Sequence, residues 1–402
     1  MPVPQPSTQG ESSKGPKTPQ LGNQEDDTNR QKILVLGWRK AGKSSCIKTI
    51  FQDVPVTDVP YFDSTQKVEK VLYDTIVPLE IWDTPSNFDT DSPDVRLGSF
   101  ATIIYVMDMQ QDDSYHEAIL PFVKVMIRAH LANPNMKFAV FIHKAEVLSE
   151  DYRGENYAEI QRAMAEELED FPYNSVQQYA PNVNFSDPSV TANIIGQLQN
   201  EVRFDMTSVH DTTLRDAWSK VIQGVMEMLP SVEQLLVNFT GTSGMDNTYL
   251  FDIGSKVVVA ADNRGRNDAT LELVTEYLLR FLQFRELYRV LGKRKDEETD
   301  GDAEGSPDGE KAVANGDDVP EEEWDEEGKT GWWDEEDPDA PWMTQSTRLM
   351  PNTTIALWQF TPYLALIVLL RTDTWVARRG MIEYNLTFLR QGIRRILMEM
   401  DG

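Results

Sequence analysis

The sequence predicts an α/β domain built on a mostly parallel sheet, followed by a second domain of the α+β class. Three observations support this fold. From about Gln31 to Leu229, apolar runs typical of strands alternate with amphipathic runs typical of helices, which is the order of βαβ units. A phosphate-binding loop occupies the turn between the first strand and the first helix. From Ser231 onward the order becomes helix, two strands, long helix, acidic insert, three strands and final helix.

The expected elements of residues 31–230 follow the spacing of their apolar side chains. The strands are Ile33–Leu36, Lys67–Leu72, Val77–Trp82, Thr102–Asp108, Phe138–His143 and Val202–Met206. The helices are Lys43–Phe51, His116–Asn133, Tyr157–Leu168 and Thr213–Met228. Because strands and helices alternate, we expect the strands of this domain to be mainly parallel.

The expected elements of residues 231–402 have a different order. The helices are Val232–Phe239, Asp268–Leu291 and Arg378–Met400, and the strands are Tyr249–Asp252, Lys256–Ala260, Ser346–Met350, Thr354–Phe360 and Tyr363–Arg371. The apolar faces of Asp268–Leu291 and Tyr363–Leu370 are more than a small domain must bury alone. They form either its core or a surface for a second subunit.

Two segments are expected to be disordered because of their composition. Residues 1–30 are rich in Pro, Gln, Ser and Gly. Residues 293–343 form an acidic insert that carries most of the net charge of -28, with 21 Asp or Glu and two Lys between Asp296 and Asp339. The insert is either a solvated loop or, because Trp324, Trp332 and Trp333 lie among the acids, a transient docking segment for a basic surface.

Composition also limits which partners and which cellular compartment we expect. The acidic balance argues against nucleic acid as a partner. The single cysteine, Cys46, excludes an internal disulfide and is typical of a reducing cytosol. The most apolar stretch, Ile355–Leu370, contains Gln359 and Pro362 and is shorter than the roughly 18–20 residues that span a bilayer. Since Pro2 replaces the glycine that N-myristoylation requires, we expect a cytoplasmic protein that reaches a membrane only through partners, without direct insertion.

The strongest functional motif is a complete phosphate-binding loop between an apolar strand and a helix. Its glycines let successive backbone N–H groups surround a phosphate, and the helix N-terminus adds partial positive charge. Lys43 is expected on the β- and γ-phosphates. The expected phosphate-binding residues are Arg39, Lys40, Ala41, Gly42, Lys43, Ser44 and Ser45 in this loop and Ser86 further along the chain. The motif predicts a nucleoside polyphosphate as the ligand.

Three residues are the expected Mg²⁺ site. The Ser44 hydroxyl follows from the loop motif. Thr65 lies on a polar loop downstream, where it would bind the metal and the γ-phosphate, although an ordinary polar turn has the same composition. Asp83 ends an apolar strand, where a parallel sheet would place a carboxylate that acts on the metal through bound water, although a turn Asp also fits.

A base-recognition motif follows the strand that ends at His143. The sequence His-Lys-Ala-Glu has the position and shape of the Asn-Lys-x-Asp motif that reads guanine. The Glu146 carboxylate would accept hydrogen bonds from guanine N1 and N2, and the Lys144 stem would cover the ring plane. A backbone N–H near Ser208 would meet the guanine oxygen, although Thr-Ser after a strand is also a common helix cap. The expected base-binding residues are His143, Lys144, Glu146, Ser208 and Val209.

In combination these motifs resemble those of Rag-family GTPases of the RagC/RagD type, including their fungal counterpart. The resemblance covers about Gln31 to Leu397, apart from the acidic insert. His143 in place of Asn is itself a mark of this subtype. The matching segments are Gly37–Ser45, Ser64–Lys67, Phe141–Lys144, Leu250–Asp252, Asn352–Thr354 and Gly380–Asn385.

The resemblance implies a Ras-like P-loop G domain followed by a roadblock- or longin-like C-terminal domain. It implies GTP, GDP and Mg²⁺ as ligands, and slow hydrolysis that a folliculin-type GAP accelerates. It also implies an obligate heterodimer with a RagA/RagB-type GTPase through the second domain. Such a heterodimer would signal amino-acid sufficiency to TOR complex 1 from a scaffold complex at the lysosomal or vacuolar membrane.

Three departures from the usual G-domain pattern leave catalysis and the strength of guanine specificity open. Ser86 replaces the glycine that usually contacts the γ-phosphate, and serine resists positive φ. Asn87 replaces the glutamine that usually orients the attacking water, and it is one methylene shorter. Glu146 replaces the usual aspartate, so its longer side chain requires a shifted base or backbone.

Two functions of different classes therefore remain. The protein is either a slow switch GTPase, with Asn87 and Thr65 as its expected catalytic residues, or a nucleotide-binding heterodimer subunit with negligible hydrolysis. The departures at Ser86 and Asn87 favour the second function, and the intact phosphate and metal residues favour the first. A P-loop kinase is disfavoured because no second-substrate lid with clustered Arg is evident.

Overall fold

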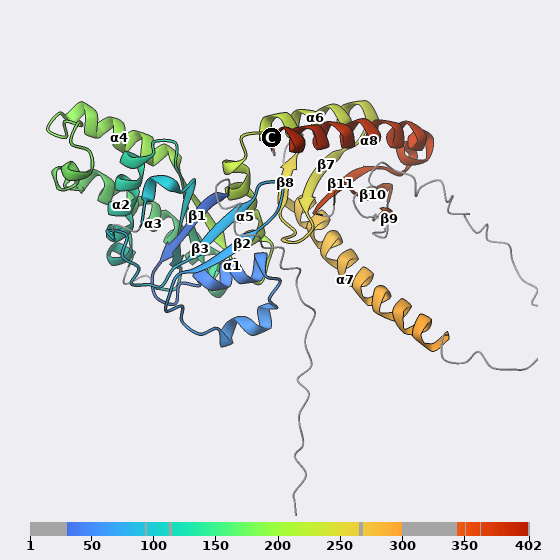
Figure 1. Ribbon diagram of the computed structural model, residues 1–402, viewed down its shortest axis with the longest axis horizontal. Helices are drawn as coiled ribbons and strands as arrows, with labels where there is room; N and C mark the ends of the chain where they lie inside the picture. Colours follow the sequence, from blue (N-terminus) through green and yellow to red (C-terminus); the bar gives the residue numbers. More distant parts are fainter. Residues whose placement is uncertain are drawn as a thin grey trace, which may run out of the picture.

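The computed structural model describes residues 30–92, 95–111, 115–264, 268–299, 344–349, 351–361 and 363–400. It shows two domains that meet at helix α5 (Thr213–Val225) (Figure 1). Residues 1–29 of the expected N-terminal arm and residues 300–343 of the expected acidic insert lie outside the described residues.

The first domain is built on one sheet, whose strand order over the described residues is β2-β3-β1-β4-β5-β6. Strand β2 runs antiparallel to β3, and the other neighbouring pairs are parallel. The mostly parallel sheet confirms the predicted fold class of this domain. The strands are β1 (Gln31–Gly37), β2 (Glu69–Tyr73), β3 (Leu79–Asp83), β4 (Thr102–Asp108), β5 (Lys137–His143) and β6 (Val202–Thr207).

Helices cover both faces of this sheet, because alternate residues of its buried strands point to opposite sides. Ile33 and Val35 of β1 lie in the cluster with α1 and α5, whereas Leu34 and Leu36 lie in the cluster with α2, α3 and α4. The sequence did not predict α4, whose apolar stripe is narrow. The remaining helices are α1 (Lys43–Phe51), α2 (Tyr115–Ala132), α3 (Glu150–Asp170) and α4 (Pro188–Glu201), with a short 3₁₀ segment η1 (Val56–Tyr61).

The second domain is an antiparallel sheet with helices, which confirms the predicted α+β class. The strand order over the described residues is β8-β7-β11-β10-β9. Its strands are β7 (Asn247–Asp252), β8 (Val258–Ala261), β9 (Thr344–Leu349), β10 (Thr353–Gln359) and β11 (Leu364–Arg371). Its helices are α6 (Leu229–Ser243), α7 (Asp268–Thr299) and α8 (Thr372–Met400).

Helices α6 and α8 lie side by side on one face of this sheet, and α7 packs on the other (Figure 1). Strand β11 lies between β7 and β10 with Leu364–Leu370 buried, so this segment belongs to the core of the domain. Helix α7 continues past the expected end at Leu291 to Thr299, into the first residues of the expected insert. The sequence Lys293–Thr299 is rich in Lys, Arg and Glu, which favour helix even without apolar periodicity.

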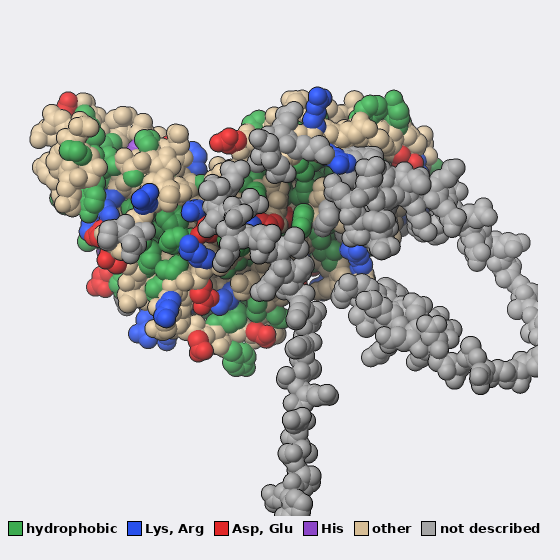
Figure 2. Space-filling model, viewed as in Figure 1, with side chains coloured by type: hydrophobic (Ala, Val, Ile, Leu, Met, Phe, Trp, Pro, Cys, Tyr) green, Lys and Arg blue, Asp and Glu red, His purple; other side chains and the backbone are tan. Residues whose placement is uncertain are grey.

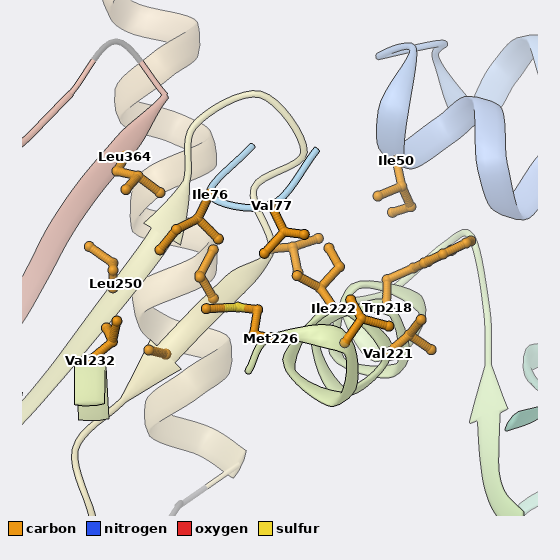
Figure 3. Packing of buried hydrophobic residues seen from close by; sticks show 14 of the residues in the cluster. Ile50, Ile76, Val77, Trp218, Val221, Ile222, Met226, Val232, Leu250 and Leu364 are labelled. Atoms are coloured by element: carbon orange, nitrogen blue, oxygen red, sulfur yellow. The ribbon is translucent and has the colours of Figure 1, made fainter. Parts of the chain in front are cut away.

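A continuous apolar core joins the two domains. Ile76 and Val77, in the turn between β2 and β3, lie close to Met226 near the end of α5, and Val232, Leu250 and Leu364 of the second domain complete the cluster (Figure 3). Apolar area removed from water stabilises a contact in proportion to its size. The two domains are therefore packed as one unit in this structure.

A buried carboxylate reinforces this contact. Asp252, at the end of β7, accepts hydrogen bonds from the hydroxyls of Tyr73 and Thr75 in the first domain. Within its own domain it accepts from the backbone N–H and the hydroxyl of Ser255, at 2.7 and 2.6 Å. Gly254 leaves room for the tyrosine, since a Cβ at this position would lie 2.3 Å from the Tyr73 hydroxyl. Four donors thus satisfy one buried carboxylate at the domain junction.

Replacing Tyr73 by Phe should lower the free energy of unfolding by about 1.5–2 kcal/mol, because a hydrogen bond to a charged group is lost. Urea unfolding followed by circular dichroism, with nucleotide at a fixed excess, measures this change. The matched control is Tyr363→Phe, at an exposed tyrosine, which should leave stability unchanged. Equal stability of the two variants would contradict a contribution of the Tyr73–Asp252 bond.

The described surface is mixed in charge, and acidic and basic side chains lie interspersed on the face that Figure 2 shows. Within the described ranges, none of the helices combines the length and the apolar character that crossing a bilayer requires.

Candidate nucleotide-binding site

The phosphate-binding loop connects β1 to α1, and two of its glycines are required by geometry. Gly37 has φ +150°, and a Cβ there would lie 2.3 Å from the Val106 carbonyl oxygen. Gly42 has φ +98°, a value that side chains with a Cβ rarely adopt. The buried Lys43 ammonium donates to the carbonyl oxygens of Gly37 and Trp38, at 2.9 and 3.1 Å. The lysine thus folds back along the loop and fixes its curvature.

A cavity of about 380 Å³ lies over this loop and brings together residues that are distant in the sequence. It joins most of the expected phosphate-binding residues to Thr65 and Ser86, and Ala41 is buried beneath it. Segment η1 and the residues after it close one side, which the sequence did not predict. The lining residues are Arg39, Lys40, Gly42, Lys43, Ser44, Ser45, Val59, Pro60, Phe62, Asp63, Ser64, Thr65, Thr84, Pro85, Ser86 and Lys144.

The three expected metal residues meet beside this cavity, which Ser44 and Thr65 line. The Ser44 hydroxyl donates to Asp83 Oδ2 at 2.5 Å and lies 2.7 Å from the Thr65 hydroxyl. Thr65 also donates to the same Asp83 oxygen at 3.3 Å. The second oxygen, Asp83 Oδ1, is buried and has no hydrogen-bond partner among the described residues. Two hydroxyls and a partly unsatisfied carboxylate form the hard oxygen donor set that Mg²⁺ prefers, so these residues fit the ion.

Burial changes the protonation equilibria of this cluster. It lowers the pKa of Lys43, although the nearby Asp83 carboxylate raises it. Burial likewise raises the pKa of Asp83, against the hydrogen bond from Ser44 and the charge of Lys43. The charged forms of Lys43 and Asp83 therefore stabilise each other. An anion bound at Lys43 would stabilise the charged lysine in the same way.

The segment after β3 carries two of the three departures from the usual G-domain pattern, Ser86 and Asn87. Thr84 donates to the Val35 carbonyl at 2.6 Å, and the Phe88 N–H donates to the Pro85 carbonyl at 3.2 Å, which closes a turn. Ser86 lines the cavity. Asn87 is exposed and is not among the lining residues, so the structure does not place it beside the expected phosphates.

Arg128 of α2 holds the far end of this segment, a contact that the sequence did not predict. Its guanidinium forms an ion pair with Asp91 and donates to the Thr90 carbonyl at 3.2 Å. Arg128 also lies over the ring of Tyr179, 4.3 Å from its centroid. The loop that contains Ser86 and Asn87 is thus anchored at both ends. No local pattern could reveal this, because the contact depends on how α2 packs.

The expected base-binding residues lie at the ends of two neighbouring parallel strands, since His143 of β5 is paired with Thr207 of β6. The Lys144 ammonium donates to the Lys40 carbonyl at 2.9 Å and to Asp108 at 2.6 Å. Lys144 therefore reaches from the base side to the phosphate-binding loop. Asp108 ends β4 as Asp83 ends β3, and this shared position is the signal by which the sequence could have revealed it.

The other base-side residues lie outside the cavity lining. Glu146 is exposed, and its carboxylate lies 3.9 Å from His210 Nε2. The Ser208 N–H donates to the Thr213 hydroxyl at 2.9 Å, and the Ser208 hydroxyl accepts from the His210 N–H at 3.0 Å. Val209 is partly buried against the core. The structure therefore places this group beside the phosphate cavity, and its contact with a base stays a prediction.

Comparison with known protein families shows which family the chain belongs to. Residues 32–278 match the model of the Gtr1/RagA G protein conserved region, which is more than half of the chain. The chain belongs to the Gtr1/RagA family of G proteins. Proteins of this family are GTP-binding G proteins, and the matched residues include the phosphate-binding loop.

Several relatives are similar to this chain over different shares of its length. Ras-related GTP-binding protein C of Homo sapiens is 26% identical over 376 residues, which is 92% of this chain and 77% of the relative. GTP-binding protein gtr2 of Schizosaccharomyces pombe is 26% identical over 374 residues, 91% of this chain and 98% of the relative. GTP-binding protein GTR1 of Saccharomyces cerevisiae is 21% identical over 243 residues, 58% of this chain and 70% of the relative. The similarity thus extends further along the chain for the RagC and gtr2 relatives.

Proposed function

We propose that this Gtr1/RagA-family protein is a guanine-nucleotide switch that binds GTP or GDP with Mg²⁺ and hydrolyses GTP slowly. The observation that carries the proposal is the meeting of Ser44, Thr65 and Asp83 beside the buried Lys43. Ser44 and Thr65 would bind Mg²⁺ directly, and Asp83 would hold a metal-bound water. When bound, Mg²⁺ neutralises negative charge on the β- and γ-phosphates.

The protein's own groups would position the nucleotide. Lys43 would donate to the β- and γ-phosphates, and the loop N–H groups from Lys40 to Ser45 would surround the β-phosphate. The Ser86 N–H would meet the γ-phosphate, and Asn87 would orient the attacking water. Because Asn87 points into solvent here, hydrolysis requires this turn to move or a GAP to supply a group. On the base side, His143, Lys144, Glu146, Ser208 and Val209 would select guanine, with Glu146 the discriminating residue.

Asn87→Gln tests the catalytic part of this proposal. The longer amide should reach the attacking water better, and single-turnover release of phosphate from bound GTP should rise about 10-fold, since small errors of position cost large factors in rate. The matched control is Asn135→Gln, at an exposed asparagine after α2, which should leave the rate unchanged. An unchanged rate in Asn87→Gln would contradict the explanation of slow hydrolysis by the shorter side chain of Asn87. Negligible release by both the native protein and the variant would favour the alternative function, a nucleotide-binding heterodimer subunit with negligible hydrolysis.

We propose residues 31–230 as the GTPase domain and residues 231–402 as a roadblock-like dimerisation domain. Within the described residues, the β8 edge of the second sheet is covered by α5, whose Ser219 and Gln223 donate to the Val258 carbonyl. Strand β9 lies at the opposite edge. On α7, Leu273 and Phe284 are 45% and 59% exposed. A strand edge that is unpaired among the described residues, on a domain with exposed apolar side chains on α7, suits a RagA/RagB-type partner.

Phe284→Glu should weaken assembly with a co-expressed RagA/RagB-type chain while GTP binding persists, which analytical ultracentrifugation and nucleotide retention together measure.

Family resemblance supports the remaining roles: attachment to a lysosomal or vacuolar scaffold complex, a folliculin-type GAP, and signalling of amino-acid sufficiency to TOR complex 1. Under this proposal the protein is cytoplasmic and peripheral at the membrane through these partners.

A further inference from the structure

A second cavity lies at the junction of the two domains, between α5 on one side and β8 and α7 on the other. Its volume is about 430 Å³, which is within the range of small-molecule sites. The expected nucleotide-binding residues are absent from its described lining, so this junction cavity is separate from the nucleotide site. The lining residues are Asp211, Thr212, Thr213, Arg215, Asp216, Ser219, Lys220, Lys256, Val258, Leu271, Glu272 and Thr275.

The two lysines of the junction cavity already have partners. The Lys220 ammonium forms ion pairs with Asp205 and Asp216, at 2.8 and 2.6 Å. The Lys256 ammonium lies 2.6 Å from Oδ1 of Asp53, which belongs to the first domain. Because these carboxylates neutralise both lysines, neither lysine requires a ligand.

Arg215, in the first turn of α5, differs from the lysines. Its Nε atom is buried and has no hydrogen-bond partner, and no described carboxylate forms an ion pair with its guanidinium. Burial lowers the pKa of Arg215, and the charges of Asp53 and Glu276 oppose this effect. These two acids are paired with other residues, Asp53 with Lys256 and Glu276 with Arg280. A buried donor of a charged group is costly without an acceptor, so Arg215 is a group that a ligand could satisfy.

Other groups of the lining suit the same kind of ligand. Thr212 is the N-cap residue of α5, but its hydroxyl makes no capping hydrogen bond. Val258 and Leu271 supply apolar surface on the opposite wall. The acids Asp211 and Glu272 are exposed, so water and salt screen their charges. Two oxygens of a carboxylate or a phosphate match the donors of a guanidinium, and the rest of such a ligand would contact the apolar wall.

We propose that the junction cavity binds a small organic anion, whose carboxylate or phosphate group pairs with Arg215 and whose apolar part contacts Val258 and Leu271. The Thr212 hydroxyl would donate a second hydrogen bond to the anion. The proposal goes beyond the proposed function, because it concerns a cavity outside the nucleotide site. Since both domains form this cavity, a bound anion would stabilise their junction.

The test uses phenyl phosphate and benzoate as probes, and neutral benzamide as the matched control ligand. Ligand-observed NMR titrations of the full-length protein, with GDP and Mg²⁺ in excess to fill the nucleotide site, measure binding. At least one anion should bind with a dissociation constant on the order of 1 mM, a usual affinity for ligands of this size, and benzamide should not bind. Binding of phenyl phosphate alone would identify a phosphate as the head group, and binding of benzoate alone a carboxylate.

Variants of the lining test which groups hold the anion. Arg215→Gln, which removes the charge and keeps a long polar side chain, should weaken binding about 10-fold or more. Arg215→Lys keeps the charge without the planar fork and should weaken binding about 3-fold, as should Thr212→Val, which removes only a hydroxyl. The matched control is Arg162→Gln, at an exposed arginine of α3, which should bind the anion like the native protein.

Three results would overturn the proposal and leave the proposed function standing. The first is the absence of binding by both anions, and the second is equal binding of benzamide. The third is native binding in Arg215→Gln together with its loss in Lys43→Ala, which would assign the probes to the phosphate-binding loop. Retention of GDP in the same samples shows whether Arg215→Gln is folded, and Thr212→Val decides if it is not. Failure of the native protein to retain GDP would overturn the proposed function, while the Arg215 and Thr212 variants still decide this proposal.

Discussion

Lys43→Ala should lower the affinity for GTP about 100-fold. A charge-assisted hydrogen bond contributes about 1.5–3 kcal/mol, and each 1.4 kcal/mol is a factor of ten in affinity. The variant also leaves the carbonyl oxygens of Gly37 and Trp38 without the ammonium that now bonds to them. Isothermal titration of nucleotide-free protein with a non-hydrolysable GTP analogue in Mg²⁺ measures the loss.

Two further variants test whether the loss of affinity is specific to the Lys43 ammonium. Lys137→Ala, at an exposed lysine that begins β5, should bind the analogue like the native protein. Lys43→Arg keeps the charge, but a planar fork cannot reproduce the bonds of a compact ammonium, so it should also bind weakly. Native affinity in Lys43→Ala would mean that the cavity over the loop does not hold the phosphates.

Trp218→Ala should lower the free energy of unfolding by about 3–5 kcal/mol, the usual range for deleting a large buried aromatic side chain. Trp218 of α5 is fully buried. Its ring lies edge-on to Phe51 and Phe141, with centroids 4.7 and 5.7 Å apart, and its Nε1 donates to the Cys46 carbonyl at 3.0 Å. This side chain therefore joins α1, β5 and α5 in the core that continues into the second domain.

Denaturant unfolding at a fixed excess of GDP measures this effect, because bound nucleotide adds to the apparent stability. The matched control is Tyr152→Ala, at an aromatic residue of α3 that is 62% exposed and should change stability by less than about 0.5 kcal/mol. A loss in Trp218→Ala no larger than in the control would contradict the single continuous core.

The sequence predicted best those features that depend on local pattern. Helix Lys43–Phe51 and strand Thr102–Asp108 have the predicted bounds, because each lies between clear turn signals and its apolar side chains are regularly spaced. The structure brings Ser44, Thr65 and Asp83 together as the motif order predicts, since the ends of parallel strands meet at one edge of a sheet.

Features that depend on contacts between distant segments could not be predicted. The bonds of Tyr73 and Thr75 to Asp252 cross about 180 residues of chain and require both domains to be in place. The packing of His143 beneath Gly42 has no local signal, because it depends on how β5 meets the loop. Asn87 was expected near the γ-phosphate from its place in the motif. In the structure Asn87 is exposed and lies outside the cavity lining, although its neighbour Ser86 lines the cavity.

The most direct test of the proposed switch function is single-turnover release of phosphate from γ-labelled GTP bound to the full-length protein with Mg²⁺, beside Ser44→Asn. The native protein should retain the label and release it slowly as phosphate, and Ser44→Asn should lose both properties, because Ser44 joins the metal site to the loop. Failure of the native protein to retain GTP, or equal retention in Ser44→Asn, would contradict the proposed function.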